Sequence, residues 1–537
     1  MKRQSLHNIQ DGLFDVLVIG GGITGANVLW DATLRGMRSI LLEKNDYASG
    51  TSQATSKFIH GGLRYLKNME LSLVRESLRE RRTLAKITPH AVRPLEFLIP
   101  VYSLSEKLLL RLGMFLYDKL SFDKNHSISS DVMLPPYRFY NREETFHKAP
   151  QVRREGLLGS FVYFDYTNTN PERHTTEFIF SAKNRGAQAF NYVEVKSVKA
   201  NSEFYLVQFQ DRLSGEELQV KTKVVINASG PWADFTDSLA GVTTEKKLLR
   251  SKGIHVVTRK ICREQCDVIK KKDGSHLFVI PWRNKTIIGT TDTKFATHPD
   301  ELHVTREEIL DLIEEVNHSY GFADLTLNDV DFYYAGLRPL VEDSKHLGDT
   351  YNASRKSEVM DYGDKGFPGY FSALGGKYTT SRAVAQSVVD KVAAYLKESY
   401  PACTSEKTPL DAGNYADLKT LVKDMQRKYP TVDGEKVETL CSRYGNTTGA
   451  ILQEKQGGVC VLANGEKLYG EEIAFIAKNE DVHFASDFYF RRSGAGVPGL
   501  PLQEEQDKIL QILQATLAWD DAKVKQDAVE IEKRYRF

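Results

Sequence analysis

One short stretch near the N-terminus constrains the fold more than any other part of the sequence. The β-branched apolar run 14–19 leads directly into Gly20-Gly21-Gly22-Ile23-Thr24-Gly25, a helical pattern follows over 26–36, and a second apolar run, 38–42, ends in Glu43. A buried strand, a glycine turn, a helix and a second strand are the parts of a β-α-β unit. The stretch therefore predicts a Rossmann-like α/β domain.

The glycines of this turn have the spacing of a dinucleotide-binding motif. Gly20 permits a tight turn, Gly22 lets the backbone approach a pyrophosphate, and Gly25 lets helix and strand pack closely. The N-terminus of the following helix offers free N–H groups to an anion. Glu43 is placed to accept a hydrogen bond from a ribose 2′-hydroxyl and would repel a 2′-phosphate. The pattern predicts FAD or NAD rather than NADP, with a ligand-free glycine turn as the alternative.

Two later segments favour FAD over NAD. The buried run 224–226 leads into the small residues 227–230, which would return the chain beside the nucleotide. Residues 371–380 again form a strand, a glycine turn and a helix start, and Lys377 adds a cation suited to the electron-rich N1/C2=O edge of a flavin. Two nucleotide-facing turns far apart in the sequence fit one long FAD better than NAD.

The overall composition excludes several classes of protein. Hydrophobic residues make up 41% and charged residues 27%, which indicates a folded globular chain. The 72 Lys+Arg and 71 Asp+Glu residues nearly cancel, so we expect no nucleic-acid partner. The five cysteines form no CxxC pair, so we expect neither a disulfide framework nor a metal site. Residues 1–8 lack the apolar core of a secretory signal, and no apolar run reaches about 18 residues. These features predict a cytoplasmic protein.

Periodicity divides the chain into two parts. Segments of helical and alternating character continue to residue 397, Pro401 and Pro409 interrupt a polar linker over 398–414, and most segments of 415–537 have a helical period. We expect FAD-binding pieces at about 1–90, 155–250 and 345–397, and substrate-binding pieces at about 91–154 and 251–344.

Taken together, the motifs resemble the FAD-dependent glycerol-3-phosphate dehydrogenase family, with the glycerophosphate oxidases as close relatives. The resemblance covers about 14–395 and continues weakly at 443–445 and 487–492. It rests on the stretches 18–25 with Glu43, 51–57, 60–65 (HGGLRY), 227–232, 252–255, 288–292, 336–340 (GLRPL) and 375–380. The first motif alone would indicate only a flavoprotein, whereas HGGLRY together with GLRPL is much narrower.

This resemblance implies a fold and a reaction. The fold is a Rossmann-like FAD-binding domain with an inserted antiparallel-sheet substrate domain, as in glycine oxidase and D-amino-acid oxidase, followed by an all-helical C-terminal domain. The reaction is oxidation of sn-glycerol 3-phosphate to dihydroxyacetone phosphate, with hydride passing to N5 of non-covalently bound FAD and the hydroxyl proton passing to a base. Electrons would leave to a membrane quinone.

The resemblance also assigns roles to single residues. It places Arg64, Tyr65, Thr291, Arg338, Arg355 and Lys377 around the substrate. It implies cofactor contacts from Thr51, Ser52, Ser56, Lys57, His60, Gly61, Gly62, Val193, Ala228, Gly230, Trp232, Arg338, Gly376, Lys377, Tyr378 and Thr379. Arginine forks match phosphate geometry, and Arg338 would stabilise developing alkoxide. For an arbitrary arginine, a surface ion pair is the commoner role.

Two histidines in these motifs are candidates for the base. His60 precedes two glycines that would let substrate or flavin approach, and His255 opens an apolar run. Histidine has the pKa that suits a base near neutral pH. We favour His60 and keep His255 as an alternative base and substrate contact. A hydrogen-bonded core histidine is the structural alternative for either.

The electron acceptor and the partners are less constrained. The oxidases usually carry an insert between GLRPL and the later GGK motif, whereas only 34 residues separate Leu340 from Gly375 here. This favours the quinone-linked dehydrogenase over an oxidase that releases hydrogen peroxide, and a non-catalytic flavin-binding interaction protein is the third reading. The apolar and basic segment 104–120 is a candidate for contact with the inner face of the cytoplasmic membrane. The resemblance also implies a homodimer.

Overall fold

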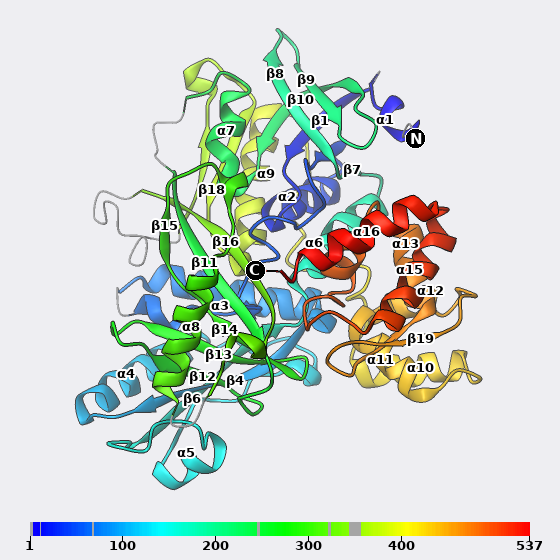
Figure 1. Cartoon of the computed structure of the whole chain (residues 1–537). Helices are drawn as coiled ribbons and strands as arrows, with labels where there is room; N and C mark the ends of the chain where they lie inside the picture. The colour runs from blue at the N-terminus through cyan, green and yellow to red at the C-terminus, as the bar shows by residue number, and fades with distance from the viewer. Residues whose placement is uncertain are drawn as a thin grey trace.

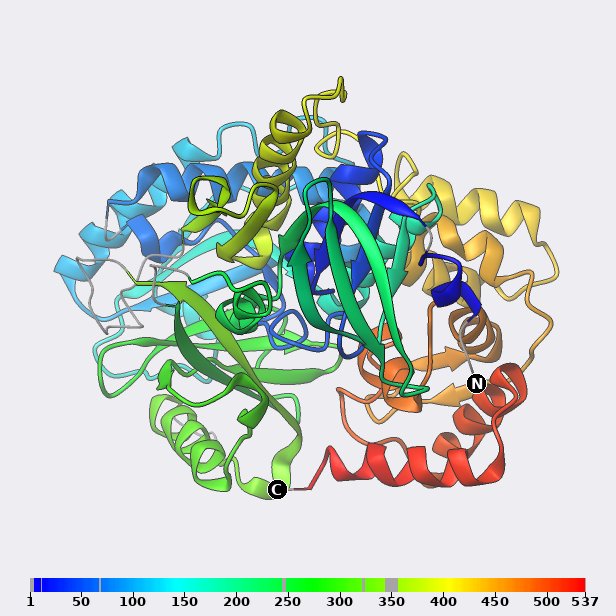
Figure 2. The ribbon, with the colours of Figure 1, turned by 90° about the horizontal axis from the view of Figure 1, so that it is seen from above.

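The structure is a computed structural model and describes residues 4–10, 12–66, 69–243, 248–320, 324–342 and 356–536. Two large sheets and a mostly helical C-terminal region make up the molecule (Figure 1). Seen from above, the C-terminal helices lie along one side of the two sheets (Figure 2).

The first sheet contains the predicted β-α-β unit. Its strand order is β17 (Ser357–Asp361), β18 (Tyr370–Gly375), β10 (Glu217–Asn227), β1 (Leu13–Ile19), β2 (Ser39–Leu42) and β7 (Gln188–Phe190). Strand β1 pairs in parallel with both neighbours. Its Val16 and Val18 pack on helices α2 (Ile23–Leu34), α6 (Pro171–Lys183) and α9 (Ser381–Leu396). Its Leu17 and Ile19 pack on β8 (Val193–Ala200) and β9 (Tyr205–Asp211), so both faces are buried, as the unbroken apolar run predicts.

The second sheet is antiparallel with one exception. Its order is β15 (Thr293–Phe295), β11 (Leu248–Thr258), β14 (Lys285–Gly289), β13 (His276–Trp282), β12 (Cys266–Lys270), β4 (Val92–Val101), β6 (Gly159–Asn168) and β3 (Phe58–Ile59), with β16 (Val330–Val341) beside β11 and β5 (Arg138–Tyr140) beside β6. Among the described strands of this sheet, only β12 and β4 pair in parallel. Strands β3 and β6 fall in the expected FAD-binding pieces but join this sheet, because β6 matches β4 along ten residue pairs.

Helices cover both faces of the second sheet. Helix α8 (Arg306–Ser319) buries Ile309, Leu312 and Val316 on one face. Helices α3 (Leu71–Ile87) and α4 (Leu104–Leu120) pack on the other face. Short helices α1 (Gln4–His7), α5 (Arg142–Lys148) and α7 (Ala233–Ser238) complete this part. No helix within the described ranges has the length and apolar content needed to cross a bilayer.

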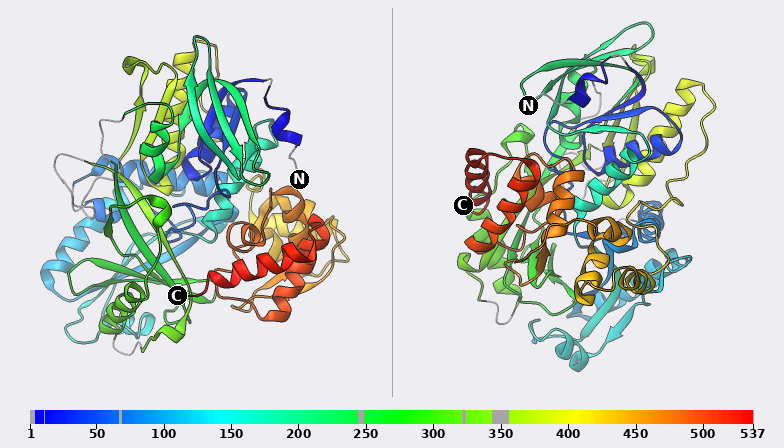
Figure 3. Two further views of the ribbon diagram at one scale, coloured as in Figure 1. Left: turned by 45° about the horizontal axis from the view of Figure 1, so that its top comes forward. Right: turned by 90° about the vertical axis from the view of Figure 1, so that its right-hand side faces the viewer.

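The C-terminal region follows a linker without helix or strand between α9 and α10. Its helices are α10 (Leu418–Lys428), α11 (Gly434–Tyr444), α12 (Thr448–Ile451), α13 (Gly470–Asn479), α14 (Ala485–Asp487), α15 (Gln503–Leu517) and α16 (Asp521–Lys533). The expectation of an all-helical domain missed a hairpin of β19 (Val459–Val461) and β20 (Lys467–Tyr469), whose connection contains the turn-forming pair Asn464-Gly465. Figure 3 shows these helices against the flank of the molecule. Phe490 stacks on Phe332 of β16, with ring centroids 5.5 Å apart.

Candidate active site

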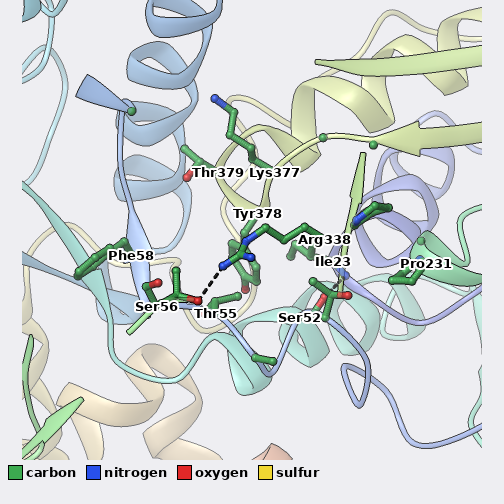
Figure 4. A pocket seen from close by; sticks show the side chains of 18 of the residues that line it. Ile23, Ser52, Thr55, Ser56, Phe58, Pro231, Arg338, Lys377, Tyr378 and Thr379 are labelled. Carbon is green, nitrogen blue, oxygen red and sulfur yellow. Dashed lines mark hydrogen bonds between the residues drawn. The ribbon is translucent and has the colours of Figure 1, made fainter. Parts of the chain in front are cut away.

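A cavity of about 1330 Å³ is lined by residues from both sheets. The predicted site residues that line it are Gly20, Gly22, Glu43, Thr51, Ser52, Ser56, His60, Gly62, Arg64, Tyr65, Val193, Ala228, Gly230, Trp232, His255, Thr291, Arg338, Gly376, Lys377, Tyr378 and Thr379. Arg355 lies outside the described residues. Figure 4 shows that one loop carries Ser52 and Ser56, whereas Arg338 and Lys377 come to the cavity from two other segments of the chain.

The glycine turn forms one wall of the cavity. Gly20 has a φ of +111°, and a Cβ there would lie 2.8 Å from the Ala228 carbonyl oxygen. A Cβ on Gly25 would lie 1.9 Å from the Gly20 carbonyl oxygen, so Gly25 serves close packing and does not itself line the cavity. The Ser52 Oγ accepts a hydrogen bond of 2.9 Å from the Ile23 backbone N–H. The loop after β2 thus supports the first turn of α2.

Glu43 follows β2, and its carboxylate is hydrogen-bonded to backbone N–H groups. Its carboxylate accepts hydrogen bonds from the backbone N–H of Gly21 at 2.6 Å and of Asn45 at 2.8 Å. Burial raises the pKa of the Glu43 carboxyl, and the two N–H groups oppose that shift. Because Glu43 also lines the cavity, its contact with a ribose stays a prediction.

Two residues that were expected to contact the cofactor pack into the protein interior instead. The Lys57 ammonium is buried in an ion pair with Glu172 and does not line the cavity. A buried ammonium needs such a partner, which directs the side chain away. Gly61 also lies behind the wall, where a Cβ would come within 2.5 Å of the Tyr117 hydroxyl and 2.3 Å of Leu78. Neither residue lines the cavity, and their contact with the cofactor stays a prediction.

Arg338 is the best anchored of the predicted substrate residues. Its Nη2 donates to the Thr290 Oγ1 at 2.7 Å and its Nη1 to the Ser251 Oγ at 3.1 Å. The Ser251 hydroxyl in turn donates to Asp292 at 2.7 Å, and that carboxylate lies 4.0 Å from Arg338. The side chain keeps 25% of its surface exposed at the cavity. A guanidinium held in this way can present its charge in a fixed direction.

A second group of cations gathers around Tyr65. The Lys377 ammonium lies 4.3 Å from the Tyr65 ring centroid, and the Arg64 guanidinium carbon lies 5.7 Å from it. The Lys377 Nζ also donates to the Ser77 Oγ of α3 at 2.8 Å. Gly62 has a φ of +75° and admits the Tyr65 ring, because a Cβ would lie 2.4 Å from it. The HGGLRY turn therefore brings two cations and an aromatic ring to one side of the cavity.

The two candidate histidines differ in their surroundings. His255 is 2% exposed, stacks on Tyr334 and shares a hydrogen bond of 2.9 Å between its Nε2 and the Ser56 Oγ. Its buried Nδ1 has no hydrogen-bond partner. Burial, followed by the charges of Arg338 and Lys57, lowers the pKa of His255 well below its usual value. His255 is therefore a neutral imidazole.

His60 is less deeply enclosed and lines the cavity beside the cations. Burial lowers its pKa to about 4, and the charges of Lys377 and Arg64 act in the same direction while Asp165 opposes them. Its backbone N–H donates to the Thr379 Oγ1 at 3.3 Å, which ties the HGGLRY turn to the later GGK turn. His60 is also neutral near pH 7 and can accept a proton.

Several supporting residues were missed by sequence reasoning. Behind His60, the Tyr117 hydroxyl donates to Asp165 at 2.7 Å and accepts from the Gly61 N–H at 3.0 Å, while Arg81 pairs with the same carboxylate. Their partners lie far apart in the chain, and no local motif marks them. The same holds for Ser251, which anchors Arg338.

At another edge of the cavity, three residues form a contact between the sheets. Asp300 accepts from the Trp232 Nε1 at 2.8 Å and from the Lys44 ammonium at 2.8 Å. Lys44 also lies 4.7 Å from the Trp232 ring centroid. Trp232 was expected as a cofactor residue, and here it also closes one edge of the cavity.

An apolar extension runs from the cavity toward α4. Leu109, Leu112 and Met114 of this helix line it, together with Phe278 of β13. The cavity therefore joins a polar region, with the glycine turn and the cations, to a region of aliphatic and aromatic side chains.

These residues fit a dinucleotide cofactor with a small anionic substrate. The volume exceeds the roughly 300–1,000 Å³ of sites for drug-sized ligands. Gly20 and Gly376 hold left-handed backbone that leaves room for a close ligand, and the start of α2 supplies N–H donors. The separate cations Arg64, Arg338 and Lys377 suit a phosphate and a developing negative charge.

Comparison with known families agrees with this arrangement. A family described as "FAD dependent oxidoreductase" matches residues 15–390, and one described as "C-terminal domain of alpha-glycerophosphate oxidase" matches residues 403–524. A glycerol-3-phosphate dehydrogenase of Synechocystis sp. is 36% identical over 508 residues, which is 90% of this chain and 89% of that protein. An aerobic glycerol-3-phosphate dehydrogenase of Staphylococcus haemolyticus is 32% identical over 91% of this chain and 88% of its own length.

Solved structures resemble the whole chain or its first part. Glycerol-3-phosphate dehydrogenase from Bacillus halodurans, solved with FAD, has a TM-score of 0.78 and 26% identity and covers 99% of this chain and 96% of its own. Glycine oxidase from Geobacillus kaustophilus, with a TM-score of 0.54 and 17% identity, covers 74% of this chain and 98% of its own and shares the fold. The expected fold class is thereby confirmed, as is FAD as the cofactor.

Proposed function

The chain belongs to the FAD-dependent oxidoreductase family, in its glycerol-3-phosphate dehydrogenase and oxidase branch, and we propose that it oxidises sn-glycerol 3-phosphate to dihydroxyacetone phosphate and passes the electrons to a membrane quinone. The observation that carries the proposal is the position of the cations. Arg64, Arg338 and Lys377 line the same cavity as the glycine turn. A flavoprotein without a phosphorylated substrate has no need of three cations there, which argues against a non-catalytic role.

Each cation has a separate part in the proposed reaction. Arg64 and Lys377, which both lie close to the Tyr65 ring, would hold the substrate phosphate. Arg338, fixed by Thr290 and Ser251, would face the C2 hydroxyl and stabilise the alkoxide that develops there. Bound FAD supplies the hydride acceptor at N5. The protein's contribution is to hold the C2 hydrogen in a productive direction.

A histidine would take the hydroxyl proton. His60 lines the cavity beside the phosphate cations and carries no proton at neutral pH, so it can act as the base. A bound phosphate dianion would raise the pKa of His60 toward the working range, because an opposite charge favours the imidazolium. His255 is the alternative, although its Nε2 already shares a hydrogen bond with Ser56.

An anaerobic titration tests the substrate assignment. We expect sn-glycerol 3-phosphate to bleach the visible band of the oxidised flavin, and glycerol without phosphate to leave it unchanged at the same concentration. Glycerol is the matched control because it lacks only the group that the cations would hold. A flavin that keeps its colour with glycerol 3-phosphate would contradict the proposed reaction.

The acceptor is tested in the second half of the same experiment. The match of the C-terminal region to a domain named after a glycerophosphate oxidase favours a second candidate, an oxidase that reduces O₂ to hydrogen peroxide. After bleaching, we expect fast recovery of colour with a short-chain quinone and slow recovery in air. Fast recovery in air with stoichiometric peroxide would select the oxidase.

Helix α4 supports the quinone-linked reaction. Leu104 and Leu108 are 75% and 72% exposed, and Leu112 and Phe115, at helical spacing from them, are also exposed. Lys107, Arg111 and Lys119 lie on the same helix. An apolar face with flanking cations suits the surface of an anionic bilayer. Because α4 also lines the apolar extension, a quinone could leave the membrane and reach the cavity along it. We therefore propose peripheral attachment through α4.

A further inference from the structure

One buried ion cluster joins the C-terminal region to the loop that follows β2. Asp46, three residues after Glu43, is 1% exposed. Its carboxylate accepts hydrogen bonds from Arg492 at 2.8 and 2.9 Å, from the Arg491 Nε, and from the Asn191 Nδ2 at 2.8 Å. Arg491 and Arg492 end the π-helical turn Phe488–Arg492. Two guanidinium groups on one buried carboxylate form the strongest class of polar contact in proteins.

The positive and negative charges of the cluster are equal in number, and its side chains are buried. Arg491 also donates to Asp487 at 2.6 Å, so two arginines face two carboxylates. Arg492 is fully buried and Arg491 is 3% exposed. The two guanidinium groups keep the pKa of Asp46 well below its ordinary value in spite of burial. Removing one partner from such a cluster leaves an uncompensated buried charge.

The loop that carries Asp46 also makes three hydrogen bonds to the glycine turn. Glu43 accepts from the Gly21 N–H at 2.6 Å, and the Ala48 N–H donates to the Gly21 carbonyl oxygen at 3.0 Å. Ser52 accepts from the Ile23 N–H at 2.9 Å. The contacts on Gly21 flank Asp46 at positions 43 and 48, so a displacement of Asp46 would move both.

We propose that Asp46 is a positioning residue for FAD, through which Arg491 and Arg492 of the C-terminal region hold the loop 43–52 against the glycine turn and so set the affinity for FAD. The inference rests on the proposed location of FAD in the cavity. A loop that is already ordered loses less conformational entropy when the cofactor binds. Without the cluster, FAD binding must itself order the loop, and affinity falls.

The C-terminal region offers a matched control. Glu466 also receives two arginines, Arg283 of the second sheet at 2.7 Å and Arg443 at 3.2 Å, and Arg443 keeps a second carboxylate, Glu472. Arg491 likewise keeps Asp487 when Asp46 is changed. Glu466→Gln therefore removes an equivalent contact between regions without touching the loop 43–52.

The first experiment measures FAD binding to apoprotein by the change in flavin fluorescence. We expect Asp46→Asn to raise the Kd for FAD at least tenfold and Glu466→Gln to change it less than twofold. Because Glu466 is more exposed than Asp46, both are compared at a temperature at which circular dichroism shows each apoprotein fully folded. A Kd that changes less than twofold in Asp46→Asn, or equally in both variants, overturns the inference.

The second experiment uses the unsubstituted chain, so it does not depend on a variant folding. Coupling between two sites is reciprocal, so FAD must stabilise the contact made by Arg491 and Arg492. We expect FAD to slow hydrogen exchange of the amides at 488–493 at least tenfold, and those of α10 less than twofold. Equal exchange at 488–493 with and without FAD overturns the inference. An unsubstituted chain that binds no FAD would instead overturn the proposed function.

Discussion

Helices α3 and α4 have the same length and opposite surroundings. Each has 17 residues, and α3 carries more charged side chains than α4, yet ten residues of α3 are buried against two of α4. The two buried charges of α3 are partnered inside the protein, Arg81 with Asp165 and Glu80 with Arg382. Four leucines of α4, in contrast, are more than half exposed: Leu104, Leu108, Leu109 and Leu112. The apolar content of a helix therefore does not by itself decide whether the helix is buried. A helix is buried where the surrounding protein offers partners for its side chains.

The largest effect should come from breaking a buried partnership of α3. Arg81→Leu leaves Asp165 as an uncompensated buried charge, and we expect a loss of about 3–5 kcal/mol in the free energy of unfolding. Urea denaturation followed by circular dichroism measures it. Arg79→Leu on the same helix is the control, because Arg79 is half exposed, and it should cost less than about 0.5 kcal/mol. Equal losses of stability in the two variants would show that the buried Arg81 contributes no more than the exposed Arg79.

Removing exposed leucines from α4 should leave the free energy of unfolding unchanged and weaken attachment to the membrane. We expect Leu108→Ser with Leu112→Ser to lower partition onto anionic phospholipid vesicles about 100-fold, from roughly 1.5 kcal/mol for each leucine. Vesicle flotation measures the partition. Leu502→Ser, which changes an equally exposed leucine of the C-terminal region, should have no effect. If the α4 variant floats with the vesicles as well as the unsubstituted protein does, α4 is not the segment that contacts the membrane.

The pH dependence of stability extends the comparison to His60, whose neighbour Gly61 packs between Leu78 of α3 and Tyr117 of α4. Its pKa in the folded protein is about 4, below the unfolded value near 6.5, so the unfolded chain binds the proton more readily. Stability from this group is present above pH 6.5 and is lost as the pH falls toward 4. We expect His60→Gln to remove about 2 kcal/mol of the loss between pH 7 and pH 5, measured in urea. An unchanged pH profile in His60→Gln would exclude a depressed pKa.

The smallest effect concerns the contact of α3 with the site. The Ser77 Oγ accepts a hydrogen bond of 2.8 Å from the Lys377 ammonium. Ser77→Ala should raise KM for glycerol 3-phosphate about two- to tenfold with little change in kcat, because a single hydrogen bond contributes about 0.5–1.5 kcal/mol. Steady-state kinetics with a quinone analogue separates the two constants. A fall in kcat at constant KM would place Lys377 in the chemical step instead of in substrate binding.

The sequence predicts best what depends on neighbours in the chain. The strand, glycine turn and helix at 13–34 follow from the local pattern and agree with the structure. Most of the residues that the motifs single out line the cavity. The ion pair of Lys57 with Glu172 could not be predicted, because Glu172 lies in another segment and only the folded structure pairs them.

Contacts between distant segments could not be predicted. Nothing near Arg338 in the sequence marks Ser251 or Thr290 as its anchors. The parallel pairing of β12 with β4 within an antiparallel sheet depends on the packing of the whole domain. The hairpin at 459–469 was overlooked because its strands have three residues each, too few for a clear alternation.

The stacking of Phe490 on Phe332 has a consequence for anyone who wishes to shorten this protein. Phe332 belongs to β16, and its ring also lies 5.3 Å from Tyr535, so the last helices finish the hydrophobic core of the second sheet. A chain cut within the linker would leave that aromatic surface in water, where it favours aggregation. Minimal versions of the enzyme would have to be redesigned along β16 rather than simply truncated.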